Sequence, residues 1–328
     1  RLAVAAICGP RRSGKSYACR LLSGGAPAGG GAAAPGDGLW LWEPLGAEDG
    51  AAPLLALVDC EGFGGSRGDS GLDALLMTFC VLLSSILVLN TQGPLTEGTV
   101  GSLGLPCDFA ALSERCGDEA DRPELLWLLR DFCAEPPSAG AGPASPARQL
   151  EEAFQEGPPG GEGAAAGDAR RGLLRFFGRR RCVALPRPVD EERQLQALDS
   201  LPWGSLSGGF RDGVEALRGH LVEACRLRPK SIGGEPLTCA ALVALARQLA
   251  AAANAGAALD LRAAWVAVRG PASPECSPSA AAADADPAEE LRELARARLE
   301  RLCSGQELPG VGQLPMTDEA LEAAFRQQ

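Results

Sequence analysis

The feature that most constrains this chain is the segment Gly9–Ser16, Gly-Pro-Arg-Arg-Ser-Gly-Lys-Ser. It matches the phosphate-binding pattern G-x-x-x-x-G-K-[ST]. In that pattern backbone N–H groups surround the phosphates, the lysine reaches the β- and γ-phosphates, and the last hydroxyl serves Mg²⁺. The apolar run Leu2–Cys8 precedes the segment, and a helix-compatible run from Tyr17 to Leu22 follows it. A strand, a glycine-rich loop and a helix N-terminus in this order predict a nucleotide-binding α/β fold.

Short apolar runs alternate with helical or loop stretches along the first half of the chain. The pattern is typical of a mostly parallel sheet covered by helices on both faces. The expected strands are Leu2–Cys8, Leu54–Val58, Ile86–Leu89, Leu125–Leu129 and Cys182–Leu185. The uncharged stretch from Ala74 to Leu89 is short for a membrane span. It divides into a helix up to Leu83 and the strand that begins at Ile86.

The later part of the chain carries helical patterns. Apolar stripes at helical spacing include Val214, Leu217, Leu221 and Cys225, and then Cys239, Leu242, Val243, Leu249 and Ala250. Two more helices are expected at Glu289–Leu302 and Asp318–Phe325. We expect residues 1–228 to form the nucleotide-binding domain, with low-complexity loops at 24–38 and 136–167. Residues 229–328 would then begin an α-helical domain.

Composition excludes several other functions. A net charge of −11, from 31 Lys and Arg against 42 Asp and Glu, argues against a nucleic-acid partner. A single histidine, His220, excludes His-rich metal sites. The twelve cysteines include no C-x-x-C pair, which excludes ordinary zinc ribbons and thioredoxin-like motifs and favours a reducing, cytoplasmic location. The chain opens on Arg1 without a signal-peptide pattern, and we expect it to be a piece of a longer protein.

A second nucleotide motif, Asp59-Cys60-Glu61-Gly62, closes the strand expected at Leu54–Val58. An acidic residue at the end of a buried strand beside a P-loop is the Walker-B position, which holds Mg²⁺. Gly62 allows the backbone to approach the γ-phosphate, as in the D-x-x-G motif of GTPases. Ser16 and Asp59 are therefore the expected metal ligands.

The base that is bound is less strongly indicated. The guanine signature N-K-x-D is absent, and Arg130-Asp131 stands at the end of the strand expected at Leu125–Leu129. An aspartate there could accept both N–H donors of guanine. On the residues alone an ATPase stays open.

Several further motifs give the chain a resemblance to guanylate-binding proteins, which are dynamin-related large GTPases like the atlastins. The segments that carry it run from Gly9 to Tyr17, Asp37 to Trp42, Asp59 to Gly64, Leu82 to Ser85, Arg130 to Phe132, Arg175 to Cys182, Arg187 to Pro188, and Gln313 to Pro315. The resemblance implies an α/β P-loop GTPase domain with a mostly parallel sheet, followed by the start of an α-helical middle domain.

The resemblance also implies roles for individual residues. Arg12 is similar to an arginine finger supplied in cis, Arg130 to a base-flanking arginine, and Asp131 to the guanine contact. Arg12, Lys15, Ser16, Asp59 and Glu61 would carry catalysis, with Asp59 and Glu61 in the metal and water network. The expected nucleotide contacts are Gly9, Arg12, Ser13, Gly14, Lys15, Ser16, Tyr17, Asp59, Gly62, Arg130 and Asp131.

One departure from the family pattern concerns the loop called switch I. The family places a Mg²⁺-binding threonine where this chain has Gly36, and no threonine occurs between Gly9 and Met77. The expected function is Mg²⁺-dependent hydrolysis of GTP to GDP or GMP by a domain that dimerises when loaded. The alternative is a nucleotide-binding scaffold that has weak or no hydrolysis.

The resemblance further implies partners and a setting that these residues do not test. It suggests a nucleotide-dependent homodimer, peripheral membrane association through a C-terminal region beyond this chain, and a role in interferon-linked innate immunity.

Overall fold

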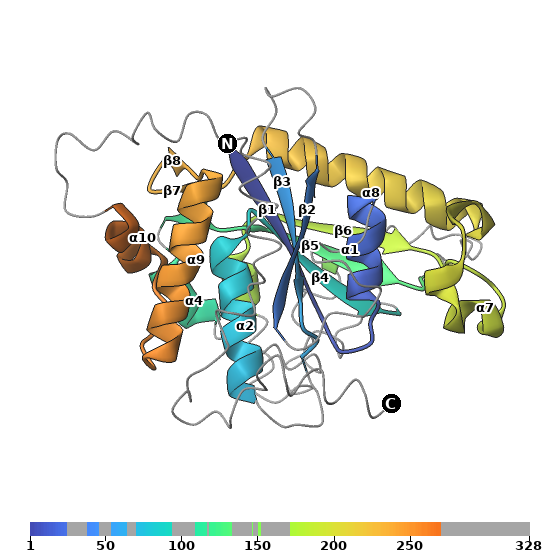
Figure 1. The fold of residues 1–328 in the computed structure, drawn as a ribbon, viewed down its shortest axis with the longest axis horizontal. Coiled ribbons are helices and arrows are strands. Elements are labelled where there is room, and N and C mark those ends of the chain that lie inside the picture. Colours follow the sequence, from blue (N-terminus) through green and yellow to red (C-terminus); the bar gives the residue numbers. More distant parts are fainter. Residues whose placement is uncertain are drawn as a thin grey trace, which may run out of the picture.

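The computed structural model describes residues 1–24, 38–45, 54–63, 70–93, 109–116, 118–132, 146, 150–151 and 171–269. A six-stranded sheet in the order β2-β3-β1-β4-β5-β6 forms its centre (Figure 1). The strands are β1 Leu2–Cys8, β2 Leu39–Leu45, β3 Leu54–Cys60, β4 Ile86–Gln92, β5 Glu124–Arg130 and β6 Arg180–Leu185. β1, β3, β4, β5 and β6 are parallel, and the five expected strands are confirmed with their ends extended by up to three residues.

The expected strands omitted β2, which pairs antiparallel with β3 at one edge of the sheet. Its sequence, Leu-Trp-Leu-Trp-Glu-Pro-Leu, contains a charge and a proline. The pairing register shifts between Trp42 and Leu45. Proline in a strand is characteristic of sheet edges, because it cannot donate to the ladder. The continuous apolar pattern used to find the buried strands therefore missed this one.

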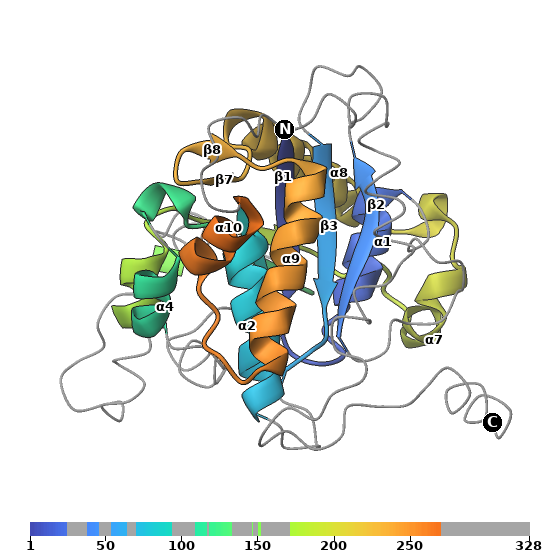
Figure 2. The same ribbon diagram turned by 60° about the vertical axis from the view of Figure 1, so that its left-hand side comes forward.

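Helices cover both faces of the sheet (Figure 2). They are α1 Lys15–Ser23, α2 Ser70–Leu83, α4 Phe109–Arg115, α7 Glu192–Gln196, α8 Gly208–Leu227, α9 Cys239–Asn254 and α10 Leu261–Arg269. The short elements are a helix over 171–176, the 3₁₀ turns Glu119–Asp121, Leu198–Ser200 and Trp203–Ser205, and the hairpin strands β7 Ser231–Ile232 and β8 Glu235–Pro236.

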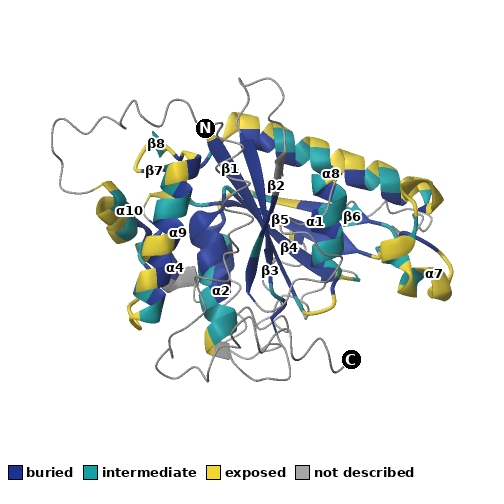
Figure 3. Ribbon diagram, in the orientation of Figure 1, coloured by how far each residue is buried: buried dark blue, intermediate teal, exposed yellow. Residues whose placement is uncertain are grey.

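Alternate residues of β1 divide the core in two. Leu2, Val4, Ala6 and Cys8 pack in one cluster with α2 and α9. Ala3, Ala5 and Ile7 pack in the other with α1 and α8. All seven residues of β1 are buried, and Figure 3 shows β1 dark blue between helices whose outer faces are exposed. A strand covered on both faces must be apolar throughout, which explains the uninterrupted run.

Side-chain caps begin two of the long helices. The Ser207 hydroxyl accepts from the Phe210 N–H at 3.4 Å, and the Thr238 hydroxyl accepts from the Ala241 N–H at 3.2 Å. The helical stripes expected after Arg211 are confirmed in α8 and α9. The helices expected at Glu289–Leu302 and Asp318–Phe325, Gly36, and most of the loops expected at 24–38 and 136–167 lie outside the described residues. Within the second of these loops, residues 146, 150 and 151 are helical, which the low-complexity composition did not predict.

The uncharged stretch from Ala74 to Leu89 forms the end of α2 and the start of β4, as expected. No helix among the described residues is both long enough and apolar enough to cross a bilayer.

The strand order places the site. β1 lies between β3 on one side and β4 on the other, so the chain reverses its direction of travel across the sheet at the carboxyl end of β1. In open α/β sheets ligands bind at such a switch point. The P-loop leaves β1 there, Asp59 ends β3 beside it, and Arg130 ends β5.

Candidate nucleotide site

The P-loop, residues 9–16, turns sharply from β1 into α1. Gly9 has φ 154°, and a Cβ on it would lie 2.1 Å from the carbonyl oxygen of Asn90. Gly14 has φ 79° and immediately precedes the helix. These two positions require glycine, because one lacks room and both need a backbone that side chains strain.

Asn90, in β4, holds the P-loop from beneath. Its buried amide donates to the Ser13 carbonyl oxygen at 2.8 Å and to the Ser13 hydroxyl at 2.9 Å. The Ser13 hydroxyl in turn donates to the Pro10 carbonyl oxygen at 2.8 Å. Sequence analysis did not select Asn90, although a single amide near the end of an apolar strand could have drawn attention to it.

Lys15 and Asp59 are two buried groups of opposite charge below this loop. The Lys15 ammonium donates to the Pro10 carbonyl oxygen at 2.9 Å, and burial lowers the pKa of Lys15 although Asp59 acts to raise it. Asp59 is 2% exposed. Burial raises the pKa of Asp59 to about 6, although the Ser16 hydroxyl and the Lys15 ammonium favour its charged form.

The Asp59 carboxylate fits a cation. Neither of its oxygens has a hydrogen-bond partner within the described parts of the chain. A buried carboxylate without donors is costly unless a cation or water completes it. Together with the Ser16 hydroxyl it offers the hard oxygen ligands that Mg²⁺ takes beside phosphates. The residues present therefore fit Mg²⁺ bound with a nucleotide.

The turn after β3 packs directly on the P-loop. The Phe63 N–H donates to the Gly9 carbonyl oxygen at 3.2 Å, and the Arg11 N–H donates to the Phe63 carbonyl oxygen at 3.2 Å. A Cβ on Gly62 would lie 2.4 Å from the Cα of Arg11 and 2.7 Å from the Nζ of Lys15. The Asp59–Gly62 motif and the P-loop therefore form one continuous structure.

The two adjacent P-loop arginines behave differently. Arg11 forms an ion pair with Glu61, and its Nε donates to the Gly62 carbonyl oxygen at 3.1 Å. The second Glu61 oxygen accepts the Gly38 N–H at 3.0 Å, at the start of β2. Arg12 is exposed at φ 59° and makes no hydrogen bond or ion pair with the described residues. The sequence motif indicated a role for Arg12, but the ion pair between Arg11 and Glu61 could not be predicted from it.

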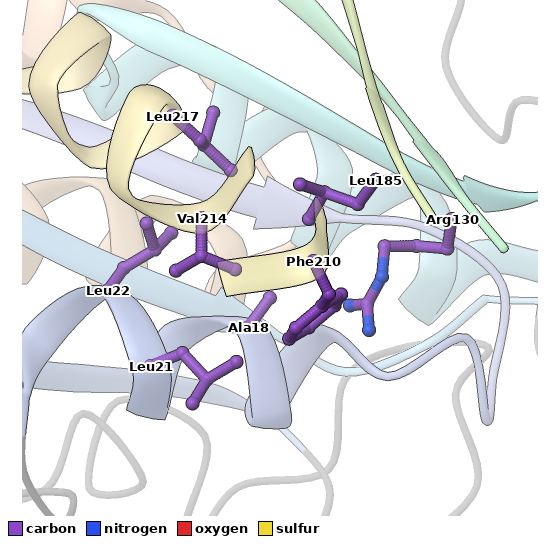
Figure 4. Close-up of a pocket in the computed structure, with 8 residues that line it drawn as sticks. All are labelled: Ala18, Leu21, Leu22, Arg130, Leu185, Phe210, Val214 and Leu217. Carbon is purple, nitrogen blue, oxygen red and sulfur yellow. The ribbon is translucent and has the colours of Figure 1, made fainter. Parts of the chain in front are cut away.

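At the carboxyl end of β5, Arg130 points back into the protein. Its guanidinium donates to the Gly14 carbonyl oxygen at 3.3 Å and lies 5.7 Å from the centre of the Phe210 ring. Burial lowers its pKa, although Asp131 and Tyr17 act to raise it. Figure 4 shows Arg130 beside Phe210 in a small apolar pocket between α1 and α8. The Arg130 guanidinium thus links the end of β5 to the P-loop through a hydrogen bond.

Tyr17 faces the same way. Its ring stacks on Phe210 at a centroid distance of 6.5 Å, and the Arg20 guanidinium lies 5.0 Å from its centre. Burial raises the pKa of Tyr17, although Arg20 acts to lower it. The contacts of Tyr17 and Arg130 are with α8 and the P-loop backbone, and their expected roles at the nucleotide stay predictions.

Asp131 is the residue at this end that reaches solvent. It is exposed at φ 58°, an uncommon backbone for a residue other than glycine. The Gln92 amide donates to its Oδ2 at 3.3 Å, and the Gly93 N–H donates to the Arg130 carbonyl oxygen at 2.9 Å. The left-handed turn, joined to the end of β4, presents a carboxylate at the carboxyl edge of the sheet.

The comparisons with known proteins agree with this geometry. The family model described as "Guanylate-binding protein, N-terminal domain" matches residues 1–227. Guanylate-binding protein 6 of Mus musculus is 27% identical over 245 residues, which is 69% of this chain and 39% of the relative. Guanylate-binding protein 1 of Homo sapiens is 27% identical over 256 residues, or 71% of this chain and 42% of the relative. The matches therefore span about two fifths of each relative. The chain belongs to the guanylate-binding protein family.

Proposed function

We propose that this chain binds GTP with Mg²⁺ and hydrolyses it to GDP or GMP. The observation that carries the proposal is the convergence of three parts at one sheet edge. These parts are the P-loop after β1, the unpartnered carboxylate of Asp59 in β3, and the exposed carboxylate of Asp131 after β5. Membership of the family supports the same function.

The phosphates would lie over the P-loop. The Lys15 ammonium, which now donates to the Pro10 carbonyl oxygen, would turn to a phosphate oxygen, since a charged acceptor makes the stronger bond. The N-terminus of α1 adds N–H groups that no helical partner uses. Ser16 and Asp59 would hold Mg²⁺, which neutralises phosphate charge when bound. The Gly62 backbone lies close enough to Lys15 to contact the terminal phosphate.

Arg12 and Asp131 would supply activation and base selectivity. Arg12 has an exposed side chain with no partner among the described residues, so it is free to move onto the phosphates when two loaded domains meet. An arginine in that position stabilises the charge that develops during phosphoryl transfer. The Asp131 carboxylate would accept two N–H donors of guanine, and adenine does not offer that pair.

A second candidate function is nucleotide binding without turnover. It is favoured by Gly36, which stands where the family has a Mg²⁺-binding threonine. A glycine has no hydroxyl to position the attacking water. Homodimerisation, peripheral membrane association and a cytoplasmic location are proposed on the family resemblance alone.

The experiment is product analysis by chromatography. The purified chain is incubated with Mg²⁺ and either GTP or ATP, and Lys15→Ala and Arg12→Ala are assayed in parallel. GDP or GMP formed only from GTP, absent with Lys15→Ala and strongly reduced with Arg12→Ala, is the expected result. GTP that stays bound but intact would establish the scaffold, and equal turnover of ATP would contradict the guanine assignment.

A further inference from the structure

Three cysteines from three separate elements meet in the core below the P-loop. They are Cys8 at the end of β1, Cys60 at the end of β3 and Cys80 in α2. All three are buried, and their sulfur atoms lie within 4.8 Å of one another. No other group of three or more potential metal-ligating side chains, of histidine, cysteine, aspartate or glutamate, occurs in the described part of the chain.

The sheet register explains why two of these thiols are neighbours. β1 and β3 are parallel, and Ile7 lies opposite Asp59, so the next residues along each strand, Cys8 and Cys60, are also adjacent. Both side chains point to the face that packs on α2, where Cys80 lies in the same cluster. The fold therefore brings three thiol side chains from three separate elements together.

We propose that Cys8, Cys60 and Cys80 form a site for a soft metal ion of low coordination number, of the class represented by Cu⁺. Thiolates select soft ions such as Cu⁺ or Zn²⁺ over Mg²⁺ and Ca²⁺. Structural Zn²⁺ is almost always four-coordinate, and these thiols gather without a fourth ligand from the described residues. A three-coordinate ion matches the donors that the structure provides.

The distances permit such an ion. Metal–sulfur bonds of about 2.3 Å place three sulfurs around one ion roughly 4 Å apart, a spacing that small side-chain rotations can reach from the present one. Binding changes no oxidation state: the ion arrives as Cu⁺, and each coordinating thiol releases its proton to solvent. Hydrogen bonds among the three thiols raise the pKa of Cys8 and of Cys80 and lower that of Cys60, and the Lys15 ammonium acts to lower the pKa of Cys8 and Cys60.

Simple core packing is the competing explanation, since buried cysteine behaves as a small apolar residue. Cys182 and Cys225 illustrate that role, because each is buried and belongs to no metal-binding group. The convergent trio differs in position. Cys8 directly precedes Gly9, and Cys60 directly follows Asp59, so a bound ion would cross-link the two strands that carry the phosphate site.

The test measures Cu⁺ uptake by the chain in which the four cysteines outside the described residues, Cys107, Cys133, Cys276 and Cys303, are replaced by serine. Cu⁺ is supplied without oxygen from a coloured Cu⁺ chelator, whose loss of colour counts the ions transferred. We expect one ion per chain. The variant that also carries Cys8→Ala, Cys60→Ala and Cys80→Ala should take up none, and the matched control with Cys19→Ala, Cys182→Ala and Cys225→Ala should still take up one.

Circular dichroism and melting temperature check that both variants fold. If the variant that lacks Cys8, Cys60 and Cys80 does not fold, X-ray absorption is measured on the Cu⁺-loaded chain that retains them. We then expect the ion to have three sulfur ligands at a single metal–sulfur distance. No uptake, equal uptake by the two variants, an oxygen- or nitrogen-rich shell, or preference for Zn²⁺ over Cu⁺ at these thiols would each overturn the proposal.

Discussion

The two ends of the nucleotide site are built in opposite ways. At the P-loop end, the loop backbone lies over a buried lysine and a buried aspartate. Asn90 of β4 and Gly62, which follows β3, contact the loop from the two sides of β1. At the carboxyl end of β5, the Asp131 carboxylate is exposed on a left-handed turn, which is joined to β4 by the contacts of Gln92 and Gly93.

The difference indicates which residues should control phosphate affinity and which should control base selectivity. In the proposed function, phosphate binding would depend on backbone positions that leave little room for an added atom, so a small substitution there should disturb affinity and folding together. Base selectivity would depend on the exposed side chain of Asp131, so a substitution there should alter specificity and leave stability unchanged. The following variants test that division, from the largest expected effect to the smallest.

Gly62→Ala should have the largest effect. The new Cβ would meet the Arg11 backbone at 2.4 Å, so the turn after β3 must move off the P-loop. We expect GTP affinity to fall more than about 100-fold, with stability lowered by roughly 1–3 kcal/mol, the range for overpacking. Calorimetric titration and urea unfolding measure the two quantities.

The matched control is Gly213→Ala in α8, where the added Cβ meets only the flexible tip of Leu185 at 2.7 Å. Its GTP affinity should equal that of the unaltered chain. Unchanged affinity in Gly62→Ala would show that the P-loop end is less rigid than its contacts indicate.

Asp131→Asn should reduce the preference for GTP over ATP by about 10- to 100-fold, because a carboxylate that accepts two guanine donors becomes an amide that can accept one. Asparagine tolerates the left-handed backbone at φ 58°, so the melting temperature should not change. Competition binding of the two nucleotides gives the ratio.

Asp199→Asn provides the control for Asp131→Asn, because Asp199 is an exposed aspartate paired with Arg20 at 3.1 Å outside the site. A preference for GTP that survives Asp131→Asn would place base recognition elsewhere.

Asp59→Asn should abolish Mg²⁺-dependent turnover and yet stabilise the nucleotide-free chain. The folded-state pKa of Asp59, about 6, is above its ordinary value of 3.8, so the folded state holds the proton more tightly. The free energy of unfolding therefore falls as pH rises from about 4 to about 6, and the whole of this loss of stability is present above pH 6. The variant should gain about 3 kcal/mol at pH 7.5 and much less at pH 4 in urea unfolding.

Asp121→Asn is the control for this gain. Asp121 is also buried, but its carboxylate accepts the Gly233 N–H at 3.1 Å, so its removal should not stabilise. A loss of stability in Asp59→Asn at pH 7.5 would mean that the carboxylate already has a favourable partner.

The smallest effect separates the two P-loop arginines. Arg11→Ala removes the ion pair with Glu61 and the bond to the Gly62 carbonyl oxygen, and should lower stability by about 1 kcal/mol, since the arginine is partly exposed. Arg12→Ala should leave stability unchanged, because its exposed side chain has no partner among the described residues. Equal melting temperatures for the two variants would contradict this assignment.

Much of the fold was predictable because it depends on local patterns. Buried parallel strands require continuous apolar runs, and phosphate loops require glycines at fixed spacing, so β1, β3 and the P-loop could be placed from sequence. β2 could not, because an edge strand is released from the apolar requirement, and its pairing is set by β3.

Side-chain direction was the part of the site that sequence did not reveal. Arg11 and Arg12 are adjacent and chemically identical, and only the approach of Glu61, 50 residues away, distinguishes them. Arg130 points toward Gly14 rather than to solvent because Phe210 of α8 packs against it. Asn90 contacts Ser13 across 77 residues of chain. Such contacts depend on tertiary neighbours that no local pattern encodes.

The central place of β1 has a consequence for how the chain is made. β1 is synthesised before its partners β3 and β4, which begin at Leu54 and Ile86. Pairing between such distant segments forms slowly. The apolar strand β1 is therefore unpaired during part of synthesis, and exposed strand edges favour aggregation. Because Asp131 follows β5, the proposed nucleotide site is incomplete until that strand has also been synthesised.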